Sequence, residues 1–379
     1  MLLERTRDGG RKILISGGGR CNVLPARLDE ARFVTDSSRH TLRNIVRSWP
    51  LPEQVTFFER ELGLTLVEEV ESAKLFPASN KARDVRDGLL KLAAARGAEV
   101  RTGVRVTGFA PEGRVWRVEL EGALPMEVEA VIVATGGYSV PNTGSDGAGL
   151  ALLRALGHTV HPTYAALTPL VAEPAPFGEL SGVSLTVSLT ARTDTRSASA
   201  TGGFLFTHRG YSGPAVLDVS HVAVRSLEEA GPPARLSVRW SHLDEHGWKA
   251  ALAPAAARTV GRALKDELPD RLAALLLARA AVDPGTPLAQ LRRDARSSLI
   301  ESLVRGQLPW TGHEGYKKAE VTGGGVSLAE IDPKTMESRK HPGLFICGEA
   351  LDAFGPIGGY NFLWAWATGR AAGRGAAAT

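Results

Sequence analysis

The chain has 379 residues, of which 43% are apolar and 23% are charged, values that are ordinary for a soluble globular protein with a core. Its length suggests two to three domains. Lys and Arg number 45 against 41 Asp and Glu, and the formal net charge of +4 does not argue for a nucleic-acid partner. No apolar run reaches the roughly 18 residues of a membrane helix. The two cysteines, Cys21 and Cys347, cannot form a disulfide framework and fit a reducing compartment. These figures predict a cytoplasmic enzyme of several domains, with no membrane partner.

The segments before residue 130 differ in their periodicity. Residues 1–50 are rich in glycine and polar residues and predict loops. Residues 52–63 carry apolar side chains at helical spacing, and residues 82–97 do the same and end in a glycine, so both are predicted helices. Between residues 104 and 120, apolar and polar residues alternate as in a half-buried antiparallel meander.

A buried parallel strand is predicted over residues 130–134. All of them are apolar, and the run is followed directly by Thr135, Gly136 and a second glycine. Such a run is typical of a strand that is covered on both faces and stops at a ligand-facing loop. A purely structural turn would have the same sequence.

The composition and the hydrophobic periodicity of the sequence change at about residue 163. Residues 166–240 contain short alternating segments broken by Gly and Pro, which predict an all-β stretch. Residues 244–309 are rich in Ala, Leu and Arg and predict helices, and after residue 320 an α/β pattern returns.

The predicted fold is therefore an α/β domain that is built from both ends of the chain and interrupted by an insertion. Its expected parts are residues 1–162 and 319–379 for the α/β domain, and residues 163–318 for the insertion, β-rich over 163–243 and helical over 244–318.

Two features near the start of the chain could contact a ligand. Glu4 ends a short apolar segment, as does the acid that binds ribose hydroxyls at the end of the second Rossmann strand. The loop 16–22 reads SGGGRCN, and Gly18 and Gly19 leave its backbone amides open to a ligand. An exposed glutamate and a flexible surface loop are the alternative interpretations.

The strongest local signal lies near the C-terminus. An apolar strand ends in Gly348 and Glu349, and a loop rich in Pro and Gly leads through Gly358 and Gly359 to a helix. Glu349 is suited to bind a polyol hydroxyl. The free N–H groups at the start of the helix suit the electron-rich edge of a reduced flavin. A glycine-rich helix cap without a ligand is the alternative.

These motifs carry a resemblance to a known family, the BaiN/YhiN-type bacterial flavoproteins. The similar segments run in order over essentially the whole chain and include RKILISGGGRCNV, KLFPASNKARDV, VIVATGGYSVPNTGSDGAGLALLRALGH, FLFTHRGYSGPAVLDVS and GLFICGEALDAFGPIGGYNFLWAWATG. The resemblance implies an FAD-dependent NAD(P)H oxidoreductase with a two-part, Rossmann-like FAD domain and a β-barrel-like plus helical insertion. One branch of this family reduces a double bond in a keto-steroid-like bile acid intermediate.

The resemblance also implies roles for single residues. It implies that Glu4 binds the ribose of FAD and that Arg11 and Lys12 lie beside its phosphates. It also implies that the backbone of Val106 contacts the edge of the adenine. The remaining expected FAD contacts are Gly18, Gly19, Cys21, Asn22, Thr135, Gly136, Gly348, Glu349, Gly358, Gly359, Tyr360 and Asn361.

The sequence departs from the family pattern at its start. Family members begin with a strand, a GxGxxG-type turn and a helix, and the turn precedes the ribose-binding acid by about 20 residues. With that acid at position 4, we expect an in-frame upstream segment of about 25–30 residues that supplies these elements.

Catalysis is expected to come from the flavin, since no triad, metal cluster or CxxC motif is visible. Tyr360 and Arg20 are the candidates for substrate-facing groups, and both cysteines are expected to be buried and inert. The sequence favours reduction of a conjugated or keto small molecule with NAD(P)H as electron donor. A flavoprotein that acts on tRNA and a flavin-free, inactive fragment are the alternatives.

Overall fold

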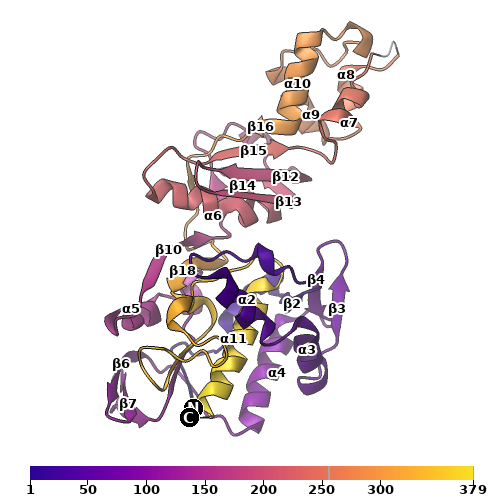
Figure 1. Cartoon of the computed structure of the whole chain (residues 1–379). Coiled ribbons are helices and arrows are strands. Elements are labelled where there is room, and N and C mark those ends of the chain that lie inside the picture. Colours follow the sequence, from indigo (N-terminus) through magenta and orange to yellow (C-terminus); the bar gives the residue numbers. More distant parts are fainter. Residues whose placement is uncertain (255–256, 379) are drawn as a thin grey trace. The chain divides into compact units, whose positions relative to one another are not determined.

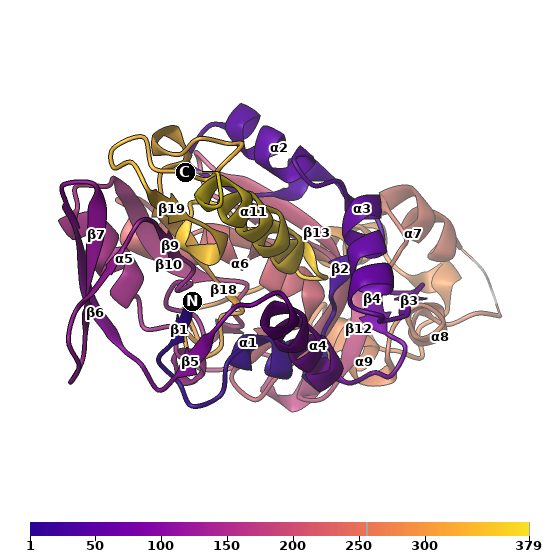
Figure 2. The same cartoon turned by 90° about the horizontal axis from the view of Figure 1, so that it is seen from below.

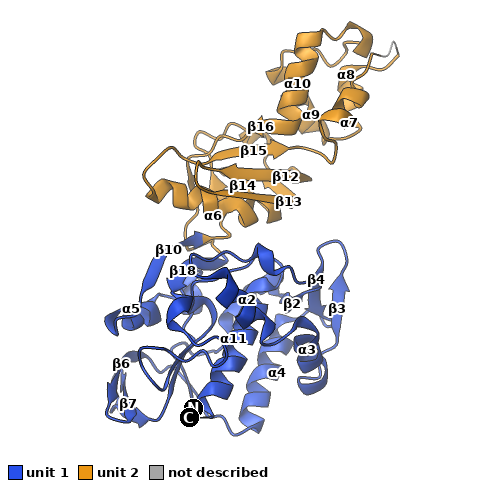
Figure 3. Ribbon diagram, in the orientation of Figure 1, with its two compact units in different colours: residues 1–165, 320–379 blue, residues 166–319 orange. Residues whose placement is uncertain are grey.

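The computed structural model describes residues 1–254 and 257–378, and the chain divides into two compact units. Unit 1 contains residues 1–165 and 320–379, and unit 2 contains residues 166–319 (Figure 3). Both ends of the chain therefore belong to unit 1 (Figure 1).

Unit 1 is a mixture of short strands and helices. Its strands are β1 (Leu2–Glu4), β2 (Leu24–Pro25), β3 (Leu66–Glu69), β4 (Lys74–Pro77), β5 (Val100–Thr102), β6 (Val106–Glu112), β7 (Val115–Leu120), β8 (Met126–Val128), β9 (Val131–Val133), β10 (Val160–Ala166), β18 (Val321–Val326) and β19 (Leu344–Ile346). Its α-helices are α1 (Arg11–Ile15), α2 (Arg39–Arg47), α3 (Leu51–Thr56), α4 (Ala82–Ala95), α5 (Ala148–Ala155) and α11 (Tyr360–Ala376).

Unit 1 contains two pairs of parallel strands, of which the β9–β19 pair contributes to its core. β1 pairs with β5, and β19 pairs with β9. No backbone ladder joins the two pairs among the described residues. Leu2 and Ile132, one from each pair, remain 45% and 43% exposed. The prediction that residues 130–134 are buried on both faces is thus wrong for Ile132 and for Ala134, which is also exposed.

Helix α11 packs against the β9–β19 pair (Figure 2). Its buried face includes Leu363, Trp364 and Ala367, which recur at the spacing of one helical turn. A side chain at Gly375 would lie 2.7 Å from the ring of Phe345 on β19, so glycine permits the close approach of helix and strand.

The remaining local predictions for unit 1 are confirmed except in its first segment. The expected helix over residues 52–63 is α3 followed by a π-helical turn at Phe57–Glu61, and the expected helix over 82–97 is α4. The meander is the antiparallel sheet β6–β7–β8. Within the predicted loop region 1–50, the structure contains helices α1 and α2.

Unit 2 has one sheet of antiparallel strands with helices packed on it. Along the sheet the order is β16, β15, β12, β13, β14, β11, β17, and the outer strands β16 and β17 do not pair with each other among the described residues. The sheet is therefore open, whereas a barrel-like insertion was expected. Its strands are β11 (Leu170–Val171), β12 (Ser184–Arg192), β13 (Ser197–Phe206), β14 (Gly210–Ser212), β15 (Arg235–Arg239), β16 (Gly306–Gln307) and β17 (Gly312–His313). Its α-helices are α6 (Pro214–Glu228), α7 (Glu245–Ala251), α8 (Val260–Lys265), α9 (Asp270–Arg279) and α10 (Arg293–Arg305).

Helix α6 contradicts the prediction that residues 166–240 are all β. Its valines favour strands, yet its buried apolar residues recur at helical spacing. Pro214 occupies the first turn, where proline is tolerated. The helix packs on β12 and β13, and burial against the sheet stabilises it.

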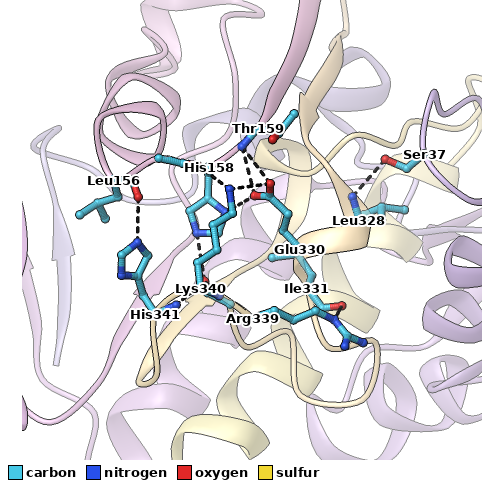
Figure 4. Close-up of polar contacts among 12 residues, drawn as sticks. Ser37, Leu156, His158, Thr159, Leu328, Glu330, Ile331, Arg339, Lys340 and His341 are labelled. Atoms are coloured by element: carbon cyan, nitrogen blue, oxygen red, sulfur yellow. Dashed lines mark hydrogen bonds and ion pairs between the residues drawn. The ribbon is translucent and has the colours of Figure 1, made fainter.

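A buried polar network joins the end of α5 to the segment before β19 (Figure 4). The carboxylate of Glu330 lies 2.7 Å from His158 Nδ1 and 2.7 Å from Lys340 Nζ, and it accepts a hydrogen bond from Thr159 N. On its other side the His158 ring lies 3.0 Å from the Ser338 hydroxyl. Burial lowers the pKa of His158, which favours the neutral ring that donates to Glu330 and accepts from Ser338.

Replacing Glu330 should make the fold less stable and less sensitive to acid. Burial opposes ionisation of Glu330, but hydrogen bonds from Lys340, Thr159 and His158 outweigh it and lower its pKa to about 2. Because an unfolded glutamate titrates at about 4.3, the ionised carboxylate stabilises the fold above that pH, and this stabilisation is lost as the pH falls toward 2. The shift corresponds to on the order of 3 kcal/mol.

In urea unfolding at neutral pH, Glu330→Gln should therefore be markedly less stable than the wild type, and the difference should shrink below pH 4. The control is Glu301→Gln, which breaks an exposed ion pair with Arg305 and should cost less than about 1 kcal/mol. Equal losses in the two variants would contradict the role of the network.

Candidate functional site

The carboxyl ends of the parallel strands in unit 1 lie close together. A side chain at Gly144, in the loop after β9, would approach Thr6 to 3.0 Å, so this loop lies against the end of β1. Arg5 and Asp146 form an ion pair between the same two segments. Ligands of open α/β sheets bind at this edge, outside the carboxyl ends of the strands.

A polar cluster at this edge is centred on Glu349, which follows β19. Its Oε2 lies 2.6 Å from Lys12 Nζ, and its Oε1 accepts hydrogen bonds from Ser139 Oγ at 2.7 Å and Thr322 N at 3.0 Å. Lys12 Nζ also lies 2.5 Å from Ser139 Oγ. The Glu349 side chain is only 15% exposed, so these partners compensate the burial of its charge.

Two of the predicted residues precede the loop that carries Ser139. Thr135 packs under α5, because Gly149 on that helix has no side chain to collide with its hydroxyl. Gly136 adopts a φ of 71°, which favours glycine. A side chain at the next residue, Gly137, would lie 2.4 Å from Thr322 Oγ1, so this position requires glycine for packing reasons.

Glu4 lies at the end of β1 and makes a separate set of contacts. Its Oε1 accepts hydrogen bonds from the Thr6 amide at 2.7 Å and the Thr6 hydroxyl at 2.8 Å. Its backbone oxygen accepts a hydrogen bond from Val104 N, and Val106, two residues further along the chain, begins β6. Arg11 is exposed at the start of α1.

The glycine loop of residues 16–22 has an unusual backbone. Gly17, Gly18 and Gly19 have φ values of 56°, 68° and 85°, and Cys21 has a φ of 60°. A side chain at Gly18 would meet nothing within 4 Å, so the loop has open space beside it. Burial raises the pKa of Cys21 to about 11, so this thiol stays protonated at neutral pH. Asn22 follows it and is half-buried.

The start of α11 adjoins the segment that follows the glycine loop. A side chain at Gly359 would lie 2.4 Å from the carbonyl carbon of Leu24, which requires glycine at the N-cap. The Asn361 side chain accepts a hydrogen bond from Gly355 N at 2.9 Å and donates to Gly355 O at 3.0 Å. This side chain holds the loop before the helix, and the first N–H groups of α11 have no partner within the helix.

Helix α11 also fixes the end of β19. Gly348 N donates to the Thr368 hydroxyl at 2.9 Å, and the Trp364 indole donates to Gly348 O at 3.0 Å. Gly348 has a φ of 70°, and a side chain there would meet nothing within 4 Å. Burial raises the pKa of the neighbouring Cys347 to about 12, so this thiol is inert as expected.

The two candidates for substrate-facing groups have structural partners. Arg20 forms an ion pair with Glu69 at 2.9 Å and lies over the ring of Phe76. Tyr360 is 5% exposed, and its hydroxyl accepts a hydrogen bond from Asp29 N at 3.2 Å and donates to Arg27 O at 3.3 Å.

A cavity of about 260 Å³ lies beside Tyr360, and the sequence analysis missed it. It is lined by Arg27, Leu28, Asp29, Arg32, Ser72, Ala73, Ile357, Gly358 and Tyr360. These residues come from three separate segments, so the sequence carries no local signal for the cavity beyond the tyrosine itself.

Asp352 is a further buried charge that the sequence analysis did not single out. Its carboxylate accepts hydrogen bonds from Ser37 N and the Ser37 hydroxyl, both at 2.8 Å, and from Asp36 N. Burial raises the pKa of Asp352, and the hydrogen bonds and His161 oppose this shift. The carboxylate ties residues 35–37 to the segment that precedes α11.

Within residues 1–254 and 257–378, no group of three or more His, Cys, Asp and Glu side chains is placed to hold a metal ion. Of the helices that the structure describes, none is both long and apolar enough to cross a membrane.

The fold and its strand ends define an α/β protein with a Rossmann-type, FAD-binding domain. The chain belongs to the family described as HI0933-like proteins with a Rossmann domain, whose model matches residues 1–375. The resemblance inferred from the sequence motifs is thereby confirmed, as is the prediction of an α/β fold with a Rossmann-like, FAD-binding domain.

Three characterised relatives are similar over nearly the whole chain. A 3-dehydro-bile acid Δ(4,6)-reductase of Clostridium scindens is 30% identical over 99% of this chain and 92% of its own length. A ribosomal RNA dihydrouridine synthase of Escherichia coli is 30% identical over 97% of this chain and 89% of its own length. The enzyme of the same name from Haemophilus influenzae is 31% identical over 95% of this chain and 88% of its own length.

Proposed function

We propose that this chain is an FAD-dependent reductase that uses NAD(P)H to reduce a carbon–carbon double bond conjugated to a carbonyl in a small molecule. The names of the three relatives support this reaction type. A Δ(4,6)-reductase of a 3-dehydro bile acid and a synthase of dihydrouridine both add hydrogen across a double bond that is conjugated to a carbonyl. The proposal rests on one structural observation, which is that the carboxyl ends of the parallel strands in unit 1 meet around Glu349.

The residues at this edge suit the sugar and ring portions of FAD. Glu4 has one carboxylate oxygen, Oε2, with no hydrogen-bond partner among the described residues, and it is suited to accept bonds from ribose hydroxyls. Glu349 would bind the ribityl chain. Gly18 and Gly348 leave open space beside the main chain, into which a flat or extended group fits.

The fit is weaker at the diphosphate. No strand followed by a GxGxxG turn and a helix occurs among the described residues, so Arg11 and Lys12 are the groups that would meet the phosphates. Lys12 already pairs with Glu349. Binding of FAD would therefore require this ammonium to be shared between the carboxylate and a phosphate.

Within such a site the protein supplies orientation and electrostatics. Bound FAD would supply the hydride chemistry. The free N–H groups of Tyr360 and Asn361 would stabilise negative charge on the pyrimidine edge of the flavin, since a helix N-terminus carries about half a positive charge. Gly19, Cys21 and Asn22 would form the wall of the ring site, and the buried, protonated Cys21 thiol would exclude water there.

A second candidate function is reduction of a uracil base within RNA. It is favoured by the two relatives that are named ribosomal RNA dihydrouridine synthases. A formal net charge of +4 over 379 residues gives it little support of its own.

The proposed function predicts a yellow protein whose flavin is reduced by NADH or NADPH. The measurement is the visible flavin spectrum of the purified chain, followed by anaerobic reduction and then by addition of a conjugated enone or its saturated ketone. Reoxidation by the enone alone is expected, because only the enone has the reducible double bond. A purified, folded chain that binds no flavin would contradict the proposal. Dihydrouridine formation in ribosomal RNA without enone turnover would favour the second candidate.

Removing the Glu349 carboxylate should weaken FAD binding. A hydrogen bond to a charged group contributes about 1.5–3 kcal/mol, so Glu349→Ala should lower the FAD affinity by about 10- to 100-fold. The measurement is flavin titration of the apoprotein, with circular dichroism as the check on folding. Glu301→Gln, in unit 2, should leave the affinity unchanged. An unchanged affinity in Glu349→Ala would show that another group binds the ribityl chain.

Two substitutions at Asn361 distinguish the contribution of its side chain from that of its backbone N–H. Asn361→Ala removes the hydrogen bonds to Gly355, whereas Asn361→Pro removes these and the backbone N–H as well. If that N–H stabilises the reduced flavin, the proline variant should have a lower reduction potential than the alanine variant. Equal potentials in two flavin-containing variants would rule out this role for the helix start.

A further inference from the structure

The cavity beside Tyr360 is too small for a whole drug-sized ligand. Its volume of about 260 Å³ lies just below the range of about 300–1,000 Å³ for ligand pockets, so it suits one group of a larger molecule. Gly358 and Tyr360, which line it, also belong to the loop and helix start that would meet the flavin ring. The cavity therefore adjoins the proposed ring site.

Charged residues make up part of the cavity lining. Two arginines, Arg27 and Arg32, and one aspartate, Asp29, are among the residues that line it. One oxygen of that carboxylate is occupied, since Asp29 Oδ1 accepts a hydrogen bond from Ala31 N at 3.0 Å. A third cation lies close, because a side chain at Gly358 would approach Lys74 Cε to 3.4 Å.

Tyr360 holds the backbone that carries these arginines. Its hydroxyl bonds to Arg27 O and Asp29 N, on either side of Leu28, and so fixes the path of the chain through this segment. The Arg32 guanidinium carbon lies 5.4 Å from the centre of the Tyr360 ring, a cation–π distance. Tyr360 is thus a positioning residue for both arginines.

We propose that this cavity is the anion-binding part of the substrate site and takes a phosphate group of the substrate. Guanidinium groups bind phosphate through paired hydrogen bonds, and a preorganised pair does so at low entropic cost. The inference rests on the proposed function, since it treats the cavity as part of the reductase site. It narrows the substrate to a phosphorylated molecule.

Such a phosphate has two chemical sources. It can belong to a small molecule, such as a nucleotide or a coenzyme A thioester, or it can belong to the backbone of an RNA. The cavity binds the same group in both cases, so the length of the bound molecule distinguishes the sources.

The test compares uridine 5′-monophosphate with uridine by calorimetric titration of the full-length protein. The phosphate should tighten binding by at least about 10-fold, as expected for charge-assisted hydrogen bonds. In Arg27→Gln/Arg32→Gln this preference should disappear while uridine binding stays unchanged. Tyr360→Phe should lose part of the preference, because the ring remains but the backbone of Arg27 and Asp29 is no longer fixed.

The matched control is Arg43→Gln, an exposed arginine on α2 that does not line the cavity. It should keep the full preference. Equal affinity for the two ligands in the wild type, or equal losses in the control and the double variant, would overturn the proposal. Flavin content is recorded on the same samples, so that loss of the cofactor is told apart from loss of the phosphate contact.

A short oligoribonucleotide and coenzyme A form the remaining arms of the test. Tighter binding of the oligoribonucleotide than of the mononucleotide, lost in the double variant, would assign the phosphate to RNA. Binding of coenzyme A as tight as that of the mononucleotide, with no gain from chain length, would assign it to a small molecule.

Discussion

The carboxylate of Glu349 is the group on which the arrangement of the strand ends depends. It connects α1 through Lys12, the loop after β9 through Ser139, and the start of β18 through Thr322. The two parallel strand pairs share no backbone ladder among the described residues, so side-chain bonds of this kind relate their ends to one another. A carboxylate with so little exposure needs a cation and hydrogen-bond donors to compensate its desolvation, and these partners provide both.

This constraint explains why small residues surround the cluster. Thr322 donates its amide to Glu349, and its hydroxyl accepts hydrogen bonds from Tyr138 N and Ser139 N. A side chain at Gly137 would displace that hydroxyl. Gly137 is therefore required by the packing of the protein itself, and Gly136 is favoured by its positive φ, in addition to any room they leave for a cofactor. The sequence alone does not separate these two requirements, because both produce the same Gly-Gly pair.

The sequence predicts those parts of the structure in which local pattern and burial agree. The meander, α3, α4 and the start of α11 follow from periodicity and glycine positions. Helix α6 was missed because valine favours strands, and only its contact with the sheet decides for a helix. Ile132 was predicted to be buried because an apolar run does not show whether one or both faces of the strand are covered. The cavity beside Tyr360 depends on segments far apart in the chain, which no local pattern reveals.

The first turn of α11 connects two parts of the proposed reaction site. Its N–H groups are directed away from the helix body and remain available to a flavin, whereas the Tyr360 hydroxyl points to the backbone of residues 27–29. Asn361 holds the loop between them by bonding to Gly355. Because these contacts come from consecutive residues of one helix, a shift of the helix start would move the flavin-facing amides and the two arginines together. In the proposed site, the position of a substrate phosphate would therefore be coupled to the position of the flavin ring.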